Sequence, residues 1–190
     1  LKRVKEFLCP VLAQLASMAL TSSSFPRRWL ESKVFFIYKK GERSDPKNYR
    51  SIAIQNPFLK IVMSALAKHI SKFAEENSIL PMFQFGFRKG RSTFSAAATL
   101  FEAVNQRLSR KPKSQRTYVC FVDFSKCFDS INREILYVKL QKLGFPHKIC
   151  KLLHFIYSHT KFFIRTGMHL AKEFESMIGL PQGCSLSPIL

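Results

Sequence analysis

The chain has 190 residues, of which 31 are Lys or Arg and 12 are Asp or Glu, so that its net charge is +19. Because 46% of the residues are hydrophobic and 13% are aromatic, the chain can bury a core, and its charge does not indicate disorder. The sequence has no repeat or compositional bias, which excludes collagen-like and coiled-coil proteins. No uninterrupted apolar run approaches the roughly 18 residues that a membrane-spanning helix needs, so we expect no membrane span.

The N-terminal half of the chain alternates between helical and strand patterns. In chain order we expect a helix over residues 2–20 interrupted by Pro10, a strand over 33–39, a polar turn, a short strand over 49–54, an amphipathic helix over 58–76, a basic glycine-containing loop over 83–91, and a helix from its N-cap Ser92 to about residue 108.

The C-terminal half begins with an exposed basic loop over residues 109–116. In chain order we then expect a strand over 117–123, a helix over 132–143 that ends at Gly144, a helix starting at Pro146, paired strands over 161–166 and 173–178 joined across Gly167, and a helix with Ser187 as N-cap and Pro188 in its first turn. The strand over 117–123 is apolar on both faces, which predicts a central strand covered by helices. The sequence therefore predicts an α+β fold around one core.

The positive charge is concentrated in residues 1–116, which hold 22 of the 31 Lys and Arg but only 7 of the 12 Asp and Glu. Such an excess favours a polyanionic partner, since each phosphate neutralised by Lys or Arg releases counterions. An anionic membrane surface is disfavoured because no basic amphipathic helix with a broad exposed apolar face is visible. A ribosomal-type tail is disfavoured because the basic residues are interleaved with core-forming ones. We therefore expect nucleic acid to be the partner.

The cysteines are odd in number, scattered, and never in C-x-x-C spacing. They are Cys9, Cys120, Cys127, Cys150 and Cys184. This pattern favours reduced, partly buried thiols in an intracellular protein over a disulfide framework or a zinc site.

Asp123 follows the apolar run that is predicted to be a buried strand. A carboxylate there is costly unless it is paired or holds a metal, and Mg²⁺ is typically held by one or two carboxylates together with substrate phosphates. The alternative, that Asp123 caps the turn into the next helix, fits the local sequence equally well. For Asp129, which precedes a helix, an N-cap or an ion pair is the favoured interpretation.

Three glycine-containing segments could bind a phosphate or nucleotide. Residues 179–183 (Gly-Leu-Pro-Gln-Gly) place two glycines around an amide, and glycine lets backbone approach a ligand closely. Basic residues at 38–41 and 48–50 could converge on a phosphate. Residues 84–91 (Gln-Phe-Gly-Phe-Arg-Lys-Gly-Arg) could follow a phosphate backbone and stack bases. Taken alone, each is more often a tight loop, a solvated hairpin or an ordinary turn.

In this order, the segments resemble the reverse transcriptase domain of non-LTR (LINE-type) retrotransposons over about residues 29–190. Lys39-Lys-Gly41 with Asn48-Tyr-Arg50 is similar to the fingers strands, and Gln84–Arg88 to the following block. Val122–Asp129 is similar to the first palm motif and Gly179–Pro188 to the second. The resemblance implies an RNA-directed DNA polymerase with a right-hand fold. Residues 1–28 would be an N-terminal helical extension, 29–116 a fingers-like region and 117–190 a partial palm.

The resemblance also implies roles for individual residues. Asp123, helped by the Phe124 carbonyl, would ligate the catalytic Mg²⁺ ions, two in the complete site, which activate the primer 3′-hydroxyl and stabilise the pyrophosphate. The dNTP site would comprise Lys39 or Lys40 with Arg50 at the triphosphate, Phe124, Phe128 beneath the sugar, and Gln182 and Gly183. The template site would comprise Gln84, Phe87, Arg88 and Arg91. An RNA template, a DNA primer and dNTPs would be the partners, without a membrane, and the location would be intracellular and nuclear.

The sequence departs from the family pattern mildly at Cys127, where the family often has Ala, and at Ser51, where it often has Pro. The third palm motif, an aromatic residue, a variable one and two aspartates, would follow Leu190, as would the thumb. We therefore expect that both ends of the chain are cuts and that the fragment itself is inactive.

Two alternatives stay open. The first is a decayed or repurposed, non-catalytic RNA- or DNA-binding module. The second is a reverse transcriptase of the group II intron or telomerase-like kind, although the spacing around Asp123 and Gln182 fits non-LTR elements better.

Overall fold

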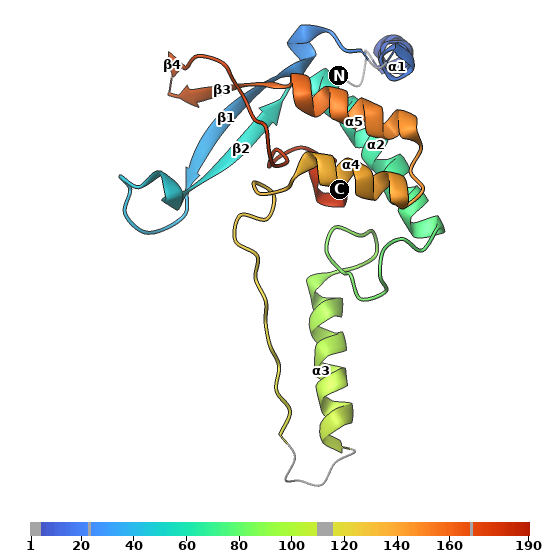
Figure 1. Ribbon diagram of the computed structural model, residues 1–190, viewed down its shortest axis with the longest axis vertical. Coiled ribbons are helices and arrows are strands. Elements are labelled where there is room, and N and C mark those ends of the chain that lie inside the picture. The colour runs from blue at the N-terminus through green and yellow to red at the C-terminus, as the bar shows by residue number, and fades with distance from the viewer. Residues whose placement is uncertain (1–4, 23, 110–115, 168) are drawn as a thin grey trace. The chain divides into compact units, whose positions relative to one another are not determined.

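The computed structural model describes residues 5–22, 24–109, 116–167 and 169–190. The chain forms two compact units rather than the single core that the sequence predicts. The larger unit comprises residues 1–68, 126–188 and 190, and the smaller comprises residues 69–125 and 189. The α+β character is confirmed, because helices and a mixed sheet occur together (Figure 1).

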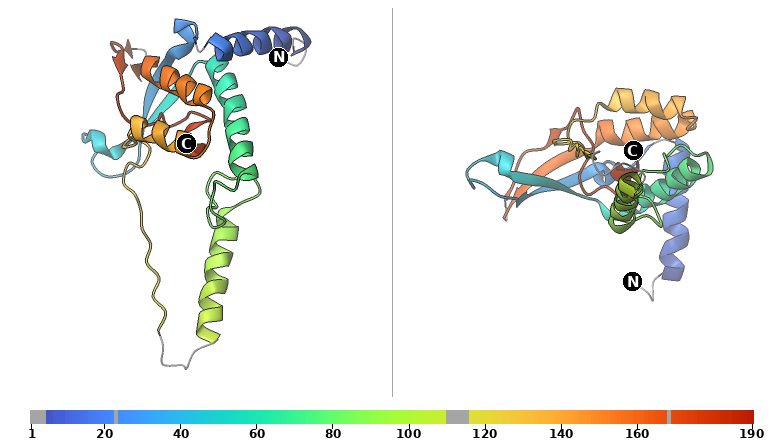
Figure 2. Two further views of the ribbon diagram at one scale, coloured as in Figure 1. Left: turned by 45° about the vertical axis from the view of Figure 1, so that its right-hand side comes forward. Right: turned by 90° about the horizontal axis from the view of Figure 1, so that it is seen from below.

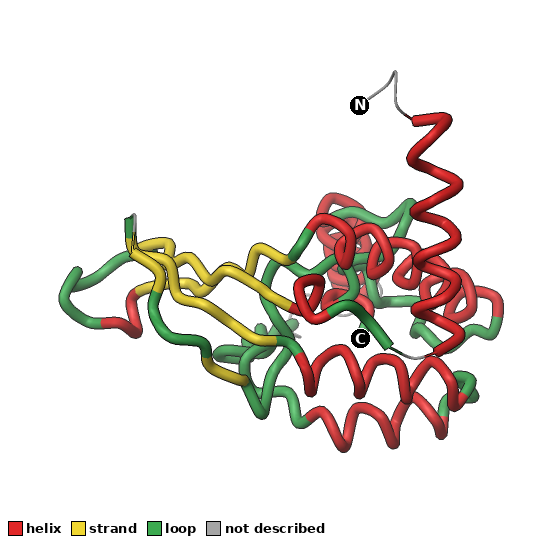
Figure 3. The backbone as a smooth tube through the Cα atoms, turned by 90° about the horizontal axis from the view of Figure 1, so that it is seen from above, coloured by secondary structure: helices red, strands yellow, loops and turns green. Residues whose placement is uncertain are grey.

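The sheet belongs to the larger unit, and its strands run side by side in one layer (Figure 3). The predicted hairpin is confirmed: β1 (Glu31–Tyr38) and β2 (Tyr49–Gln55) are antiparallel, with Val34 opposite Ala53. β3 (Lys161–Thr166) lies parallel beside β1, and β4 (His169–Leu170) and β5 (Phe174–Glu175) are antiparallel to β3. The strand predicted over 173–178 is thus shortened to two residues.

The predicted helices form where local signals are strongest. α2 (Pro57–Glu76) begins after Asn56, whose side-chain oxygen accepts a hydrogen bond from the Phe58 amide at 3.0 Å. α4 (Arg133–Lys142) is capped by Asn132 and is followed by Gly144 at φ +83°. α5 (His147–His159) starts after Pro146 and lies beside α4 (Figure 1).

The core of the larger unit contains apolar side chains of α2 and α5 and of the C-terminal segment. Its most deeply buried apolar side chains are Leu59, Met63, Leu152, Leu153, Ile156, Tyr157 and Leu186. α1 (Lys5–Ser22) continues through Pro10, contrary to the predicted interruption, because a proline removes one intrahelical hydrogen bond while the neighbouring turns keep theirs. None of the helices in the described part of the chain combines the length and the apolar character needed to cross a bilayer.

Among the described residues, short 3₁₀ helices occur as η2 (Arg27–Leu30), η3 (Pro46–Asn48) and, at the end of the chain, η4 (Ser187–Ile189). The predicted capping role of Ser187 is wrong. Leu186 is the N-cap of η4, and the Ser187 hydroxyl donates instead to the Pro181 carbonyl at 3.0 Å. The predicted capping role of Asp129 is also wrong, because Asn132 caps α4 by accepting from the Ile135 amide at 3.1 Å.

The smaller unit contains the C-terminal end of α2, a loop, α3 (Thr93–Ser109) and an extended segment. Ser92 caps α3 as predicted, its hydroxyl accepting from the Ser95 amide at 3.0 Å. None of the described residues of α3 is buried. Most of the predicted basic loop over 109–116 lies outside the described residues.

The central strand predicted over residues 117–123 is wrong. Residues 117–124 form no regular secondary structure, and their backbone runs extended (Figure 2). The Tyr118 and Phe121 side chains are 85% and 82% exposed. β-Propensity is satisfied only when a neighbouring strand supplies hydrogen bonds and apolar contacts. No described residue pairs with this backbone as a strand, so the apolar run stays solvated.

Candidate functional site

The loop at residues 179–183 is bound to the segment that immediately precedes α4. The Gly179 amide donates to the Ile131 carbonyl and the Leu180 amide to the Phe128 carbonyl, both at 2.8 Å. Gly179 has φ +79°, and a Cβ on it would lie 2.6 Å from the Asp129 carbonyl oxygen. Glycine is therefore required here for both its conformation and the close approach of the two backbones.

The same loop also binds the outer edge of the hairpin. The Ala53 amide of β2 donates to the Gln182 carbonyl at 2.7 Å. At Gly183, where φ is +109°, a Cβ would lie 2.6 Å from the Ala53 carbonyl oxygen. Two segments of the resemblance, residues 128–129 and 179–183, are thus brought together against β2.

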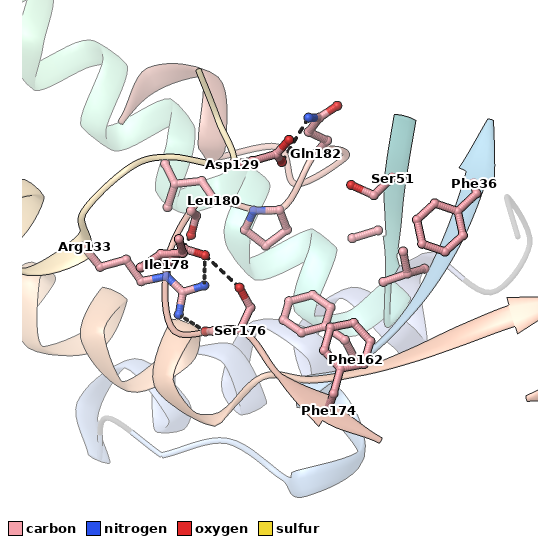
Figure 4. A pocket seen from close by; sticks show the side chains of 14 residues that line it. Phe36, Ser51, Asp129, Arg133, Phe162, Phe174, Ser176, Ile178, Leu180 and Gln182 are labelled. Atoms are coloured by element: carbon pink, nitrogen blue, oxygen red, sulfur yellow. Dashed lines mark hydrogen bonds between the residues drawn. The ribbon is translucent and has the colours of Figure 1, made fainter. Parts of the chain in front are cut away.

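A cavity of about 260 Å³ lies where these segments meet (Figure 4). Its apolar wall includes Phe36 of β1, Phe162 of β3 and Phe174 of β5, and its polar groups include Asp129 and Gln182. The Gln182 side-chain nitrogen donates to the Asp129 carboxylate at 3.2 Å. A concave apolar pocket with a few convergent polar groups is typical of small-molecule sites.

Arg133 holds the segment that leads into this loop, and sequence reasoning missed it. Its side chain starts from the first residue of α4, yet the residue is only 7% exposed. Its guanidinium donates to four backbone carbonyls, including Gly179 at 2.8 Å and Ser176 at 2.6 Å. Figure 4 shows Arg133 beside Ser176 and Ile178. Burial lowers the pKa of Arg133 from its ordinary value. An arginine in a first helical turn is usually exposed, so the sequence carried no signal for this role.

The profile of the reverse transcriptase (RNA-dependent DNA polymerase) family matches residues 37–190. The chain belongs to this family. The sequence resemblance to LINE-type reverse transcriptases is confirmed by the relatives that match it.

Three relatives show the extent of this similarity. The probable RNA-directed DNA polymerase from transposon BS of Drosophila melanogaster is 28% identical over 180 residues, 94% of this chain and 19% of that protein. The corresponding protein from the transposon X-element of the same species is 28% identical, covering 87% of this chain and 18% of that protein. The retrovirus-related Pol polyprotein from the type-1 retrotransposable element R2 of Nasonia vitripennis is 22% identical, over 94% of this chain and 17% of that protein. The chain spans about a fifth of the length of these relatives.

The residues that the reverse transcriptase resemblance assigns to the triphosphate lie on the hairpin. Lys39 and Lys40 are exposed where β1 ends, and the Lys39 amide donates to the Asn48 carbonyl at 2.8 Å. Arg50 is exposed and lies opposite Ile37. Because side chains alternate along a strand, Arg50 projects from the sheet face opposite to that of Ser51, which lines the cavity.

The predicted template residues belong to the smaller unit of the reverse transcriptase chain. The Arg88 guanidinium donates to both oxygens of Glu75, at 2.8 and 2.6 Å, and to the Pro81 and Gln84 carbonyls. Its side chain is only 8% exposed, so the structure gives Arg88 the role of holding its loop. The hydrogen bond from Arg88 lowers the pKa of Glu75. Arg91 stands over the Phe85 ring at 5.5 Å, while Gln84 and Phe87 are exposed.

Asp123 and Phe124 also belong to the smaller unit and are exposed. The predicted setting of Asp123, at the end of a buried strand, is therefore wrong. Over the described ranges, the structure contains no group of three or more His, Cys, Asp or Glu side chains placed to hold a metal ion. Among the cysteines, Cys150 and Cys184 are buried, and Cys9, Cys120 and Cys127 are exposed free thiols.

Proposed function

We propose that this chain is part of an RNA-directed DNA polymerase of a retroelement, and that residues 179–183 line its nucleotide pocket. The observation that carries the proposal is the junction of residues 128–131, 179–183 and β2 around the cavity. In the proposed arrangement residues 1–28 form an N-terminal extension, 29–116 fingers and 117–190 part of a palm. Phe128, half-buried beside the loop, would contact the sugar of a bound dNTP.

The positively charged residues of the hairpin would bind the triphosphate, and the contact with Arg50 requires the triphosphate to reach the sheet face opposite to the cavity. Lys39, Lys40 and Arg50 are all exposed and belong to a chain of net charge +19, which favours phosphate groups and nucleic acid. Gln84, Phe87 and Arg91 would contact the template, since arginine and aromatic side chains together bind single-stranded nucleic acid. Arg88 would contribute by keeping this loop in place.

Asp123 and the Phe124 carbonyl would hold a divalent cation. Both are accessible on an exposed segment, and Mg²⁺ characteristically binds one or two carboxylates while keeping several waters, so these residues fit the ion. When bound, the ion supplies Lewis-acid stabilisation of the charge that develops in nucleotidyl transfer. A two-metal site requires carboxylates besides Asp123, so we propose that the 190-residue chain by itself synthesises no DNA.

The decisive experiment is primer extension on an RNA template by the longer polymerase that contains this chain, with and without Asp123→Ala. We expect synthesis to fall by at least about a thousandfold, because metal ions contribute several kcal/mol of transition-state stabilisation. RNA binding should be retained, because the charge excess lies elsewhere in the chain. Glu102→Ala, an exposed carboxylate on α3, is the matched control and should extend primers normally.

The second candidate is a non-catalytic nucleic-acid-binding module, which the charge of +19 favours independently of any catalytic residue. It predicts salt-sensitive RNA binding without synthesis by the unmutated polymerase. Synthesis that depends on Asp123 would exclude it. The nuclear location stays a prediction, which imaging of a tagged chain would check.

A further inference from the structure

Arg133 is a buried cation whose hydrogen-bond acceptors are all backbone carbonyls. Its Nε donates to Gly179 at 2.8 Å, one terminal nitrogen donates to Ser176 at 2.6 Å and Tyr157 at 3.0 Å, and the other lies 3.4 Å from the Ile178 oxygen. None of the described acidic side chains forms an ion pair with it. The guanidinium also stands over the Tyr157 ring, 5.6 Å from its centroid.

The carbonyls come from two places in the fold. Tyr157 lies in the last turn of α5, where carbonyl groups lack intrahelical partners and carry the negative end of the helix dipole. Ser176, Ile178 and Gly179 lie on the segment that leads directly into the loop at residues 179–183. Arg133 therefore joins a helix end, which is held by the core, to the base of the loop.

The position of residues 176–179 and the stability of the buried Arg133 charge depend on each other. A buried cation without a counter-ion is costly unless its donors are satisfied, and charge-assisted hydrogen bonds are the strong ones. Three of the four acceptors exist only while residues 176–179 follow their present path. Displacing that segment would leave the buried guanidinium without most of its partners.

We propose that Arg133 is a positioning residue that sets the place of Gln182 and Gly183 in the nucleotide pocket. The role of the pocket rests on the proposed function, whereas the coupling of Arg133 to the loop does not. The Arg133 side chain also lines the cavity, and its guanidinium is bound to backbone carbonyls. It acts through the backbone of residues 176–179.

Hydrogen exchange in the 190-residue chain tests the coupling without requiring polymerase activity. The reporters are the Gly179, Leu180 and Ala53 amides, which bond to Ile131, Phe128 and Gln182. Arg133→Lys keeps the charge but replaces a planar fork by a single nitrogen, which cannot serve four carbonyls. We expect exchange at the reporters to rise at least tenfold.

The Lys39 amide, bonded to Asn48 at the far end of the hairpin, should keep its exchange rate in this variant. The matched control is Arg165→Lys, because Arg165 is exposed and donates to the single carbonyl of Gly167. Unchanged reporters in Arg133→Lys would overturn the proposal. An equal rise at all amides, or loss of the fold, would overturn it as well, because Arg133 would then support the core as a whole.

In the longer polymerase, the same variant should raise the KM for dNTP about tenfold while kcat changes less than about threefold. An equal fall in kcat with unchanged KM would contradict a positioning role at this pocket. If the unmutated polymerase makes no DNA, the proposed function fails, while the exchange result still decides whether Arg133 positions the loop.

Discussion

The side chains of Asp129 and Gln182, 53 residues apart in the sequence, are joined by a hydrogen bond of 3.2 Å at the edge of the cavity. Each side chain comes from a different segment of the reverse transcriptase resemblance. Gln182 carries the only amide side chain in the loop at residues 179–183. The Asp129 carboxylate, which lies outside the loop, therefore orients this amide.

Replacing this carboxylate should release the amide. In Asp129→Ala we expect the side-chain amide resonances of Gln182 to move towards those of a solvated glutamine, with a loss of stability below about 1 kcal/mol because the bond is exposed. Asp129→Asn keeps an acceptor oxygen and should largely restore the shifts. The side-chain amide resonances of Gln141, which is hydrogen-bonded to the His147 ring, are the internal reference. Unaltered Gln182 resonances in Asp129→Ala would refute the interaction.

Gly179→Ala should destabilise the larger unit more than Gly144→Ala. The two glycines have similar dihedrals, φ +79° and +83°, but only Gly179 has backbone within reach of an added Cβ. A left-handed conformation costs a non-glycine residue about 1–2 kcal/mol, and the contact with Asp129 adds to this at position 179 alone. Denaturant unfolding of the two variants measures the difference, and equal losses would show that the contact relaxes freely.

Tyr137 and Tyr157 should respond in opposite ways to removal of the hydroxyl. Both are buried, but the Tyr137 hydroxyl has no hydrogen-bond partner among the described residues, whereas that of Tyr157 lies 4.0 Å from the Cys184 sulfur. An unsatisfied buried hydroxyl costs about 1–3 kcal/mol. Tyr137→Phe should therefore keep or raise the melting temperature, and Tyr157→Phe should lower it. A fall of similar size in both variants would contradict this assignment.

Burial also raises the pKa of Tyr137 to about 12, above the ordinary value of 10.0. The neutral phenol of Tyr137 is thus favoured in the folded state. This preference stabilises the folded state fully below pH 10, and the stabilisation is lost as the pH rises towards about 12. The free energy of unfolding, measured at a series of pH values, should fall between pH 10 and about 12 in the unmutated chain. In Tyr137→Phe this part of the fall should be absent.

The ion pair between Arg88 and Glu75 predicts an acid-sensitive loop in the smaller unit. Because the pKa of Glu75 is lowered in the folded state, its stabilisation is present above the ordinary pKa of 4.5 and is lost as the pH falls through the folded value. Proteolysis of residues 77–91 should therefore accelerate at acidic pH in the unmutated chain and be fast at all pH values in Glu75→Gln. Glu76→Gln, which loses only the exposed pair with Lys72, is the control and should behave like the unmutated chain.

Local sequence signals were sufficient for the elements that stabilise themselves. The helices over residues 58–76 and 132–143, the cap at Ser92 and the hairpin around Gly41 were predicted because spacing, capping side chains and turn residues act over a few positions. The family was also readable, since its motifs are short and ordered along the chain. The match to residues 37–190 confirms it.

Which strands pair, and which groups each side chain contacts, was decided by the tertiary structure. The run at residues 117–123 has the composition of a strand, but strand formation depends on a neighbour that no local pattern specifies. Arg88 resembles a phosphate ligand in sequence and is bound to Glu75 in the fold. Arg133 reads as an ordinary exposed residue of a first helical turn. Its role exists only because α5 and residues 176–179 bring their carbonyls to one buried point, and such a convergence arises from packing rather than from neighbouring sequence.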